Sequence, residues 1–346
     1  MTKILDCTFR DGGYYTNWTF DKQMVYESVK ALDKAKIDYI ELGYKSPGKG
    51  GPYKKCNEKF IRDVLQEKPT AKLSFMIDLK EFVKDETFQE KLFYELIKPS
   101  KNSWFDMCRV AFNYEYVNYV PKVVACLTKL KYEVGLNFMQ IDLLTEQQMS
   151  QSIPVLKRID KFITYFYVPD SFGTMIPSVL ETYKQHLDNL LDTKLGLHTH
   201  DNLGLAFANT LQAVRLDYDI VDSTLTGMGR GVGNCKTEQL LLYQNNNAVP
   251  DILKVVDKWF VPLKEKCKWG WNSIYMTTSI MRTHPTYAQE LLNSHVDNDK
   301  ILNFLQKETI SKFDQQKIKP LTEPKICVII PARYQSSRFP GKPLAD

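Results

Sequence analysis

Short apolar runs rich in β-branched residues alternate along the chain with amphipathic stretches of helical length. The runs predict strands at 3–8, 37–42, 72–77, 105–111, 133–139, 162–168, 194–200 and 220–225. The amphipathic stretches predict helices near 21–35, 57–67, 88–98, 115–130, 144–157, 175–190, 202–215 and 236–246. Several strands are apolar on both faces, as expected where helices cover a parallel sheet. This number of strand–helix units, in about 245 residues, favours a closed (β/α)8 TIM barrel over an open doubly wound sheet.

The alternation of strand and helix patterns ends near residue 246. Residues 250–268 and 286–318 are predicted to form helices, so 247–318 should be a helical C-terminal extension packed on the barrel domain of residues 1–246. Residues 319–325 contain two prolines and are predicted to be a linker. Residues 326–346 open with a predicted strand and are too few to bury a core of their own.

Composition narrows the class of protein. The chain has 346 residues, 43% hydrophobic and 25% charged, which is ordinary for a globular protein. Its net charge of +5 comes without a long basic run, so no nucleic-acid partner is expected. The sequence shows neither a signal peptide nor an apolar run of about 18 residues, so no membrane association is expected. Seven widely spaced cysteines without a CxxC motif indicate reduced thiols, and we expect a cytoplasmic protein.

Polar residues gather where the predicted strands end, which is where barrel enzymes build their active sites. In chain order, these residues are Arg10, Asp11, Glu41, Asn137, Asp170, Ser171, His198, His200 and Asn234.

His198 and His200 are the strongest indication of a metal. Residues two apart on a strand face the same side, and this spacing suits one divalent ion if a carboxylate joins the pair. Asp11 can supply it, because a closed barrel places the first and seventh strands at one mouth. Two imidazoles and one carboxylate leave coordination positions open, which is typical of a catalytic metal. A single H-x-H is more often a pair of hydrogen-bonded histidines, but the accompanying RDG and GxGN motifs favour the metal.

Arg10 could stabilise an oxyanion or hold a carboxylate, and the alternative is a salt bridge to an acid inside the barrel. Neighbouring strand residues point in opposite directions, so Arg10 and Asp11 share a site only if the backbone turns, which Gly12 and Gly13 would permit. The later run GMGRGVG does not fit the spacing of a Rossmann nucleotide loop. It predicts a turn packed on the barrel rim, followed by Asn234 as an oxygen ligand or substrate contact.

The motifs RDGG, IELGY, HTHDNLGLAFAN and GMGRGVGN follow one another in this order. With them the chain resembles the DRE-TIM metallolyases, which include 4-hydroxy-2-oxovalerate aldolase, hydroxymethylglutaryl-CoA lyase and the isopropylmalate and homocitrate synthases. The resemblance implies a TIM barrel that holds a divalent metal, with Mn²⁺ favoured over Mg²⁺ or Zn²⁺. The implied metal ligands are Asp11, His198 and His200, and the implied substrate-binding residues are Arg10 (facing the enolate of a 2-oxo acid), Glu41, Asp170, Ser171 and Asn234.

The chain departs from the family at the residue that transfers the proton. Aldolases of the oxovalerate type carry a histidine two residues after the RDG glycine, and Tyr14 occupies that position here. The acyl-CoA-dependent synthases follow RDG with an acid and Gln, which this chain lacks. The segment GWNSIYMTTSI resembles the aldolase stretch that brings a tyrosine to the active site, with Tyr275 or Trp271 in its place. Tyr14 and Tyr275 are therefore the predicted catalytic tyrosines.

These inferences predict a metal-dependent class II aldolase that cleaves or forms a 4-hydroxy-2-oxo acid from pyruvate and an aldehyde. One alternative is a Claisen-type synthase that joins an acyl-CoA to a 2-oxo acid. Another is a catalytically silent barrel that serves as a scaffold. A homo-oligomer is expected.

The last residues carry a second resemblance. PARYQSSRFPGKPLAD is similar to the opening of CMP-sugar synthetases, the cytidylyltransferases that act on 3-deoxy-2-oxo sugar acids. The resemblance implies that residues 326–346 are the truncated start of a nucleotidyltransferase domain, with CTP phosphate contacts at Arg333, Ser336, Arg338 and Lys342. It predicts a fused or associated cytidylyltransferase and a role in making sugar acids for surface polysaccharide.

Overall fold

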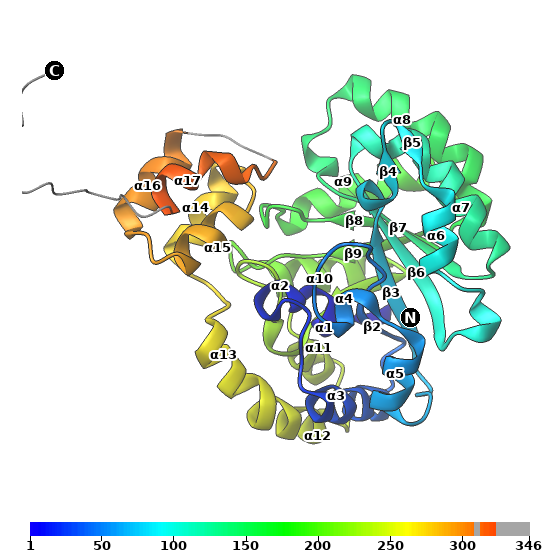
Figure 1. Ribbon diagram of the computed structural model, residues 1–346, viewed down its shortest axis with the longest axis horizontal. Helices are drawn as coiled ribbons and strands as arrows, with labels where there is room; N and C mark the ends of the chain where they lie inside the picture. The colour runs from blue at the N-terminus through cyan, green and yellow to red at the C-terminus, as the bar shows by residue number, and fades with distance from the viewer. Residues whose placement is uncertain (308–311, 323–346) are drawn as a thin grey trace, which may run out of the picture.

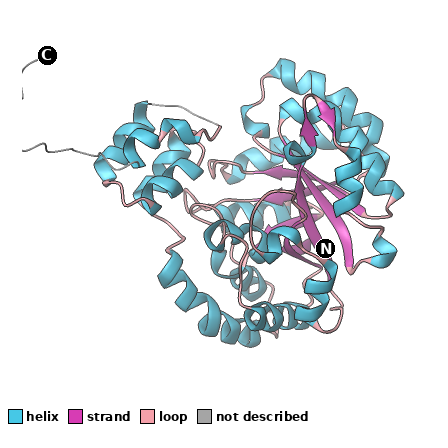
Figure 2. Cartoon of the chain, in the orientation of Figure 1, coloured by secondary structure: helices cyan, strands magenta, loops and turns pink. Residues whose placement is uncertain are grey.

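A computed structural model of the chain describes residues 1–307 and 312–322. Parallel strands close into a barrel in the order β1-β10-β9-β8-β7-β6-β3-β2, and helices surround it (Figure 2). The strands are β1 (Lys3–Asp6), β2 (Tyr39–Tyr44), β3 (Lys72–Asp78), β6 (Phe105–Phe112), β7 (Glu133–Phe138), β8 (Tyr165–Pro169), β9 (Lys194–His198) and β10 (Ile220–Ser223). Each overlaps a predicted strand, and the predicted TIM barrel is confirmed.

Helices return the chain from one strand to the next. They are α3 (Lys22–Lys34), α5 (Glu58–Leu65), α6 (Glu90–Leu96), α7 (Val120–Lys129), α8 (Glu146–Ile159), α9 (Pro177–Asp188), α10 (Ala206–Arg215) and α11 (Thr237–Tyr243). Side-chain caps fix several of their starts: Asp21 accepts the N–H groups of Gln23 and Met24, and Thr145 forms a capping box with Gln148. Helix α4 (Pro52–Lys55) and the hairpin of β4 (Val83–Lys84) and β5 (Thr87–Phe88) are insertions that the periodicity did not predict.

Aromatic side chains fill the N-terminal end of the barrel interior. Tyr39 and Tyr165 are buried there, with their ring centroids 6.0 Å apart, and the Tyr39 hydroxyl donates a 2.8 Å hydrogen bond to Glu133. The interior at this end is thus packed, and the polar strand ends lie at the opposite, C-terminal end.

The turn that places Arg10 and Asp11 differs from the prediction. Strand β1 ends at Asp6, and the helical turn α1 (Thr8–Asp11) begins before the glycines. Gly12 has φ −63°, a backbone conformation that any residue can adopt. A Cβ on Gly12, however, would lie 2.6 Å from the sulfur of Met228. Gly12 therefore permits close packing instead of making the turn. A second helical turn, α2 (Gly13–Thr16), follows α1.

The C-terminal extension has two parts. Helix α12 (Val249–Val255), the π-helical turn η7 (Val256–Phe260) and α13 (Val261–Cys267) pack on the barrel and contribute to its core. Helices α14 (Ser273–Ile280), α15 (Thr286–Asn293), α16 (Asn298–Lys307) and α17 (Lys319–Thr322) follow. They gather around a second hydrophobic cluster, which includes Tyr287, Leu291 and Leu305, to one side of the barrel (Figure 1).

Two predictions about this extension are corrected, at residues 286–318 and 319–322. The single helix predicted over 286–318 is broken into α15, α16 and the 3₁₀ turn η8 (Gln315–Lys317). Helix α14 lies between the two predicted helical stretches, and the Asn272 side chain caps it by accepting the Tyr275 N–H at 2.9 Å. Residues 319–322 of the predicted linker form α17. Residues 326–346, with their predicted nucleotide contacts, lie outside the described residues.

None of the helices in the described ranges combines the length and the apolar character that crossing a membrane requires.

Candidate active site

The three predicted metal ligands meet at the C-terminal mouth of the barrel. Asp11 comes from α1, His198 ends β9, and His200 lies two residues further on. Asp11 Oδ2 lies 3.9 Å from His198 Nε2 and 4.0 Å from His200 Nε2, and all three side chains are buried. Atoms that share one metal ion, with bonds of about 2.0–2.2 Å, have separations of this order.

The far side of each imidazole is anchored. His198 Nδ1 lies 2.8 Å from Asp222 Oδ2, and His200 Nδ1 donates a 2.6 Å hydrogen bond to the Asp170 carbonyl. Both Nε2 atoms therefore face Asp11, which is the arrangement that supports histidine ligands in metal sites. Burial, aided by the neighbouring His198, lowers the pKa of His200 to about 3, so its ring is in the neutral form that binds metals.

Neighbouring charges and a hydrogen bond keep Asp11 in the ionised form that can bind a metal. Burial would raise the pKa of this carboxyl, but Arg10 and the two imidazoles hold it well below its usual range, so Asp11 is a carboxylate. Asn234 donates a 2.6 Å hydrogen bond to Asp11 Oδ2. The other polar atom of that amide, Oδ1, is buried without a partner in the described part of the chain. Two imidazoles, a carboxylate and an unused amide oxygen fit a divalent cation.

A second group with metal-ligating atoms, Cys7, His198 and Asp222, lies deeper in the barrel. Asp222 is already bound to Arg109 at 2.6 Å, and burial raises the pKa of the Cys7 thiol well above its usual value. A protonated thiol and an occupied carboxylate make this group a poor metal site.

An ion-pair network lies beneath the ligands. Arg10 donates to Glu41 at 2.7 Å and to Asp11 at 2.5 Å. Arg109, which is fully buried, donates to Glu41 at 3.1 Å and to Asp222 at 2.6 Å. The network links Arg10 to the acid that holds His198, so it fixes the orientation of the whole site.

Sequence reasoning missed Arg109 and Asp222. Arg109 lies in the middle of the apolar run FDMCRVAF, and Asp222 lies in IVDS. A charged residue in the interior of a mostly apolar strand was the available signal, because a buried charge needs a partner.

Two connected spaces open above the ligands. An inner cavity of about 70 Å³ is lined by residues that include Arg10, Asp11, Tyr14, His198 and His200. An outer chamber of about 430 Å³ lies beyond it and is also lined by Tyr14. The barrel loops form one side of the chamber, and residues 284–286 and 312–313 of the extension form the other. The described residues thus offer a small site next to the ligands and a larger one further out.

The other predicted site residues divide into two groups. Tyr14 and Ser171 line both spaces, as the predictions require. Glu41 is fully buried beneath Arg10, and the Asp170 carboxylate accepts the N–H groups of Thr174 and Met175. Neither acid is among the described residues that line the two spaces, so their predicted substrate contacts stay predictions.

Burial raises the pKa of Asp170 to about 7, although backbone hydrogen bonds oppose the shift. This carboxyl is fully buried next to the carbonyl that orients His200, so it belongs to the support of that ligand.

Tyr275 is not brought to the inner cavity. It is 2% exposed and belongs to the hydrophobic cluster of the extension, and its hydroxyl lies 3.2 Å from that of Tyr15. Trp271, the other candidate in this segment, is 65% exposed. The extension instead brings His284 to the outer chamber. Burial, then Arg230 and Lys80, lower the pKa of His284 well below its usual value, so it is neutral.

The fold is a TIM barrel, and its C-terminal mouth carries a group of residues that could hold a metal ion. The family model for HMGL-like proteins matches residues 1–257, and the chain belongs to this family, within the DRE-TIM metallolyase superfamily.

Several known proteins are similar to the chain. The oxaloacetate decarboxylase of Mycobacterium tuberculosis is 29% identical over 242 residues, covering 69% of this chain and 68% of the relative. The 4-hydroxy-2-oxovalerate aldolase of Geobacillus genomosp. 3 is 25% identical over 258 residues, covering 74% of each.

Solved structures agree with the fold. The N-terminal domain of a candidate aldolase from Bacteroides vulgatus superimposes with a TM-score of 0.74 at 30% identity, covering 84% of this chain and 96% of that one. The HMG-CoA lyase of Bacillus subtilis, with a TM-score of 0.60 at 16% identity over 80% of this chain and 97% of that one, shares the fold.

Proposed function

We propose that the protein is a divalent-metal-dependent aldolase that cleaves or forms a 4-hydroxy-2-oxo acid, with pyruvate and an aldehyde as the smaller partners. The observation that carries the proposal is the convergence of Asp11, His198 and His200 beside Arg10 at the barrel mouth. Relatives named 4-hydroxy-2-oxovalerate aldolase support this reaction class. A silent scaffold would have no use for an anchored ligand set that opens into a cavity.

Asp11, His198 and His200 would hold the ion, with the free amide oxygen of Asn234 beside them. We favour Mn²⁺. When bound, the ion supplies a Lewis acid for the 2-oxo group and the carboxylate of the substrate.

Arg10 is the residue that faces the developing enolate. Glu41 and Asp11 hold its Nε and Nη1 atoms, so the guanidinium is fixed where it lines the inner cavity. A prepositioned cation of this kind stabilises negative charge in the transition state without reorganisation.

Tyr14 is our candidate for proton transfer at the C4 oxygen. Its ring lines both spaces, and its hydroxyl lies 3.3 Å from that of Tyr44. Burial, then Tyr14 itself, raise the pKa of Tyr44 well above its usual value, so Tyr44 keeps its proton. In synthesis, Tyr14 would donate its phenolic proton to the C4 oxygen as the C3–C4 bond forms, and in cleavage the resulting phenolate would take the C4-hydroxyl proton back as that bond breaks.

The test compares Asp11→Asn and His200→Ala with His186→Ala, a control on an exposed histidine of α9. Calorimetric titration with Mn²⁺ should show binding to the wild type and the control but not to the two site variants. Pyruvate release from 4-hydroxy-2-oxopentanoate should fall by at least about 10³-fold in the same two variants, because the metal carries the main charge stabilisation. Circular dichroism should show that both remain folded. Full activity in either variant would refute the site assignment.

A second candidate is the decarboxylation of a 2-oxo diacid, which the similarity to the oxaloacetate decarboxylase favours. Loss of CO₂ from the carboxylate β to the 2-oxo group also yields an enolate, because the electron pair of the broken C3–C4 bond moves toward the 2-oxo group. Arg10 and the same ligands would therefore serve it. If the protein releases CO₂ from oxaloacetate faster than it cleaves a 4-hydroxy-2-oxo acid, decarboxylation is its main reaction. Thiol release from acetyl-CoA with a 2-oxo acid would select the Claisen-type synthase.

The sugar-acid role and the cytidylyltransferase partner depend on residues 326–346, outside the described residues, and stay predictions. The homo-oligomer also stays a prediction.

A further inference from the structure

Arg230 lies where the inner cavity meets the outer chamber, and it lines both. Its neighbours in the chain hold it there. A Cβ on Gly229 would lie 2.7 Å from Asp11 Oδ2, so the backbone runs directly against a metal ligand. Gly231 has φ +66°, and its carbonyl accepts a 2.5 Å hydrogen bond from Tyr15. The guanidinium is therefore presented from a fixed turn next to the predicted metal.

Arg230 is an unpaired cation. Within the described ranges it makes no hydrogen bond or ion pair, and its Nε is buried without a partner. Its one described contact is with the ring of Tyr14, whose centroid lies 5.5 Å from the guanidinium carbon. A buried guanidinium nitrogen without an acceptor is costly, so the site lacks an anion or an acceptor oxygen at this point.

The other cations of the chamber already have partners. Lys80 is paired with Asp78 at 2.9 Å, and Lys312 is paired with Glu115. The neutral His284 adds no charge. Among the described lining residues, Arg230 is thus the positive group that no carboxylate of the chain balances.

The charge of Arg230 is not needed to balance the charge of the 2-oxo acid substrate. The network of Arg10, Arg109, Asp11, Glu41 and Asp222 has one more carboxylate than it has guanidinium groups. A divalent cation and the single carboxylate of a 2-oxo acid would bring it to neutrality. The positive charge of Arg230 is therefore available to bind a second anionic group.

We propose that Arg230 is a specificity-determining residue that binds an anionic group, a carboxylate or a phosphate, on the acceptor aldehyde. The inference rests on the proposed aldolase function and names the class of its second substrate. The chamber of about 430 Å³ is more than ten times the ~30 Å³ that one water occupies in the liquid, so it has room for an acceptor several carbons long. A guanidinium fork suits both carboxylates and phosphates.

The experiment measures acceptor preference with the Mn²⁺-loaded full chain and pyruvate. Succinic semialdehyde is compared with butanal, and erythrose 4-phosphate with erythrose, so the two pairs separate carboxylate from phosphate. The variants are Arg230→Met, which keeps the length without the charge, and Arg230→Lys, which keeps the charge. Arg215→Met, at an exposed arginine that ends α10, is the matched control.

We expect the wild type to prefer the anionic member of at least one pair by about 10-fold or more in kcat/KM. Arg230→Met should lower that preference by about 10-fold or more, to near unity, which is the scale of a lost charge-assisted hydrogen bond, whereas Arg230→Lys should retain most of it. Arg215→Met should keep the wild-type preference. Equal kcat/KM values for both members of each pair, or a preference that survives in Arg230→Met, would overturn the inference.

Deuterium exchange of the pyruvate methyl group separates this failure from that of the proposed function. Exchange requires only the metal and the enolate machinery. Exchange without an anionic preference would overturn the role of Arg230 alone. A wild type that neither exchanges pyruvate nor condenses it with any acceptor would overturn the aldolase assignment and this inference with it.

Discussion

The two ends of the barrel both carry charged side chains, but only the C-terminal end buries them. There, Arg109, Glu41 and Asp222 are completely buried and bound to one another. At the N-terminal end, Lys72 is 45% exposed beside Glu133, and Lys68 is 39% exposed beside Asp106. Water solvates the exposed charges, whereas each buried charge needs a partner from the protein or from a ligand. An unpaired charge is therefore informative at the C-terminal end only.

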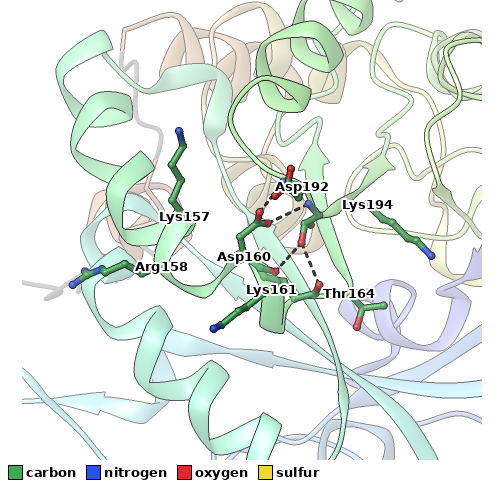
Figure 3. Close-up of a pocket in the computed structure, with 9 residues that line it drawn as sticks. Lys157, Arg158, Asp160, Lys161, Thr164, Asp192 and Lys194 are labelled. Atoms are coloured by element: carbon green, nitrogen blue, oxygen red, sulfur yellow. Dashed lines mark hydrogen bonds between the residues drawn. The ribbon is translucent and has the colours of Figure 1, made fainter.

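A pocket at the N-terminal end illustrates the difference. Figure 3 shows a pocket of about 650 Å³ at the N-terminal ends of β8 and β9. The side chains of Lys157, Arg158, Lys161 and Lys194 point away from one another there (Figure 3). The Asp160 carboxylate is occupied by the N–H groups of Asp192, at 2.7 Å, and Thr193, at 3.2 Å. Size alone thus does not mark the functional end of this barrel.

Removal of a buried acid at the C-terminal end should have the largest effect. Asp222→Ala leaves Arg109 with one carboxylate fewer and removes the partner of His198 Nδ1. The free energy of unfolding should fall by about 3–5 kcal/mol, because a buried charge is left uncompensated. Mn²⁺ affinity should fall by about 10–100-fold, because the ligand loses its anchor. Urea denaturation and calorimetric titration measure the two quantities.

The matched change at the other end is Lys68→Ala, which breaks an exposed pair. It should lower the free energy of unfolding by less than about 1 kcal/mol and leave Mn²⁺ affinity unchanged. Similar losses in both variants would contradict the contrast between the ends.

Asp6 is a buried acid that pairs with no cation of the described residues, and it should make the free energy of unfolding depend on pH. The size of this effect is intermediate. Asp6, at the end of β1, is fully buried and accepts hydrogen bonds from Thr237 at 2.6 Å and the Thr8 N–H at 3.0 Å. Burial outweighs these bonds and raises the pKa of Asp6 to about 6. The folded protein holds this proton more tightly than the unfolded chain, whose pKa is about 3.9, so a stabilising contribution present at low pH is lost as pH rises toward 6.

Asp6→Asn removes this ionisation. The free energy of unfolding of the variant relative to wild type should therefore rise by about 2–3 kcal/mol between about pH 4 and pH 7. Chemical denaturation across this pH range measures the difference. If the difference does not change with pH, Asp6 does not titrate as described.

A smaller effect than that of Asp222→Ala or Asp6→Asn is expected at the N-terminal pocket. Asp160→Ala removes the acceptor for two backbone N–H groups and should lower the free energy of unfolding by about 1–2 kcal/mol. Pyruvate release should stay at the wild-type rate, because this pocket lies at the far end of the barrel. A loss of activity without a loss of stability would show that the N-terminal end also takes part in function.

The barrel and the meeting of Asp11, His198 and His200 at its mouth could be predicted because their signals are local. Alternation of strand and helix patterns is visible in short windows, and the two-residue spacing of His198 and His200 places both side chains on one face. Asp170 was correctly placed at the end of a strand, whereas Glu41 lies within β2, and the side-chain contacts of both acids were not predicted. Whether an acid touches a substrate or a neighbouring arginine depends on side chains from other strands.

By itself, the sequence determined the order of the elements, the closed barrel and the cluster of polar residues at its mouth, because hydrophobic periodicity and motif spacing record them within each segment. Only the tertiary structure decided which charges are buried together and which one is left unpaired. Arg109 and Asp222 are 113 residues apart and meet because the barrel closes. Arg230 is unpaired because the loop and the extension bring no carboxylate of the described chain to it, and pairing across such distances leaves no local pattern.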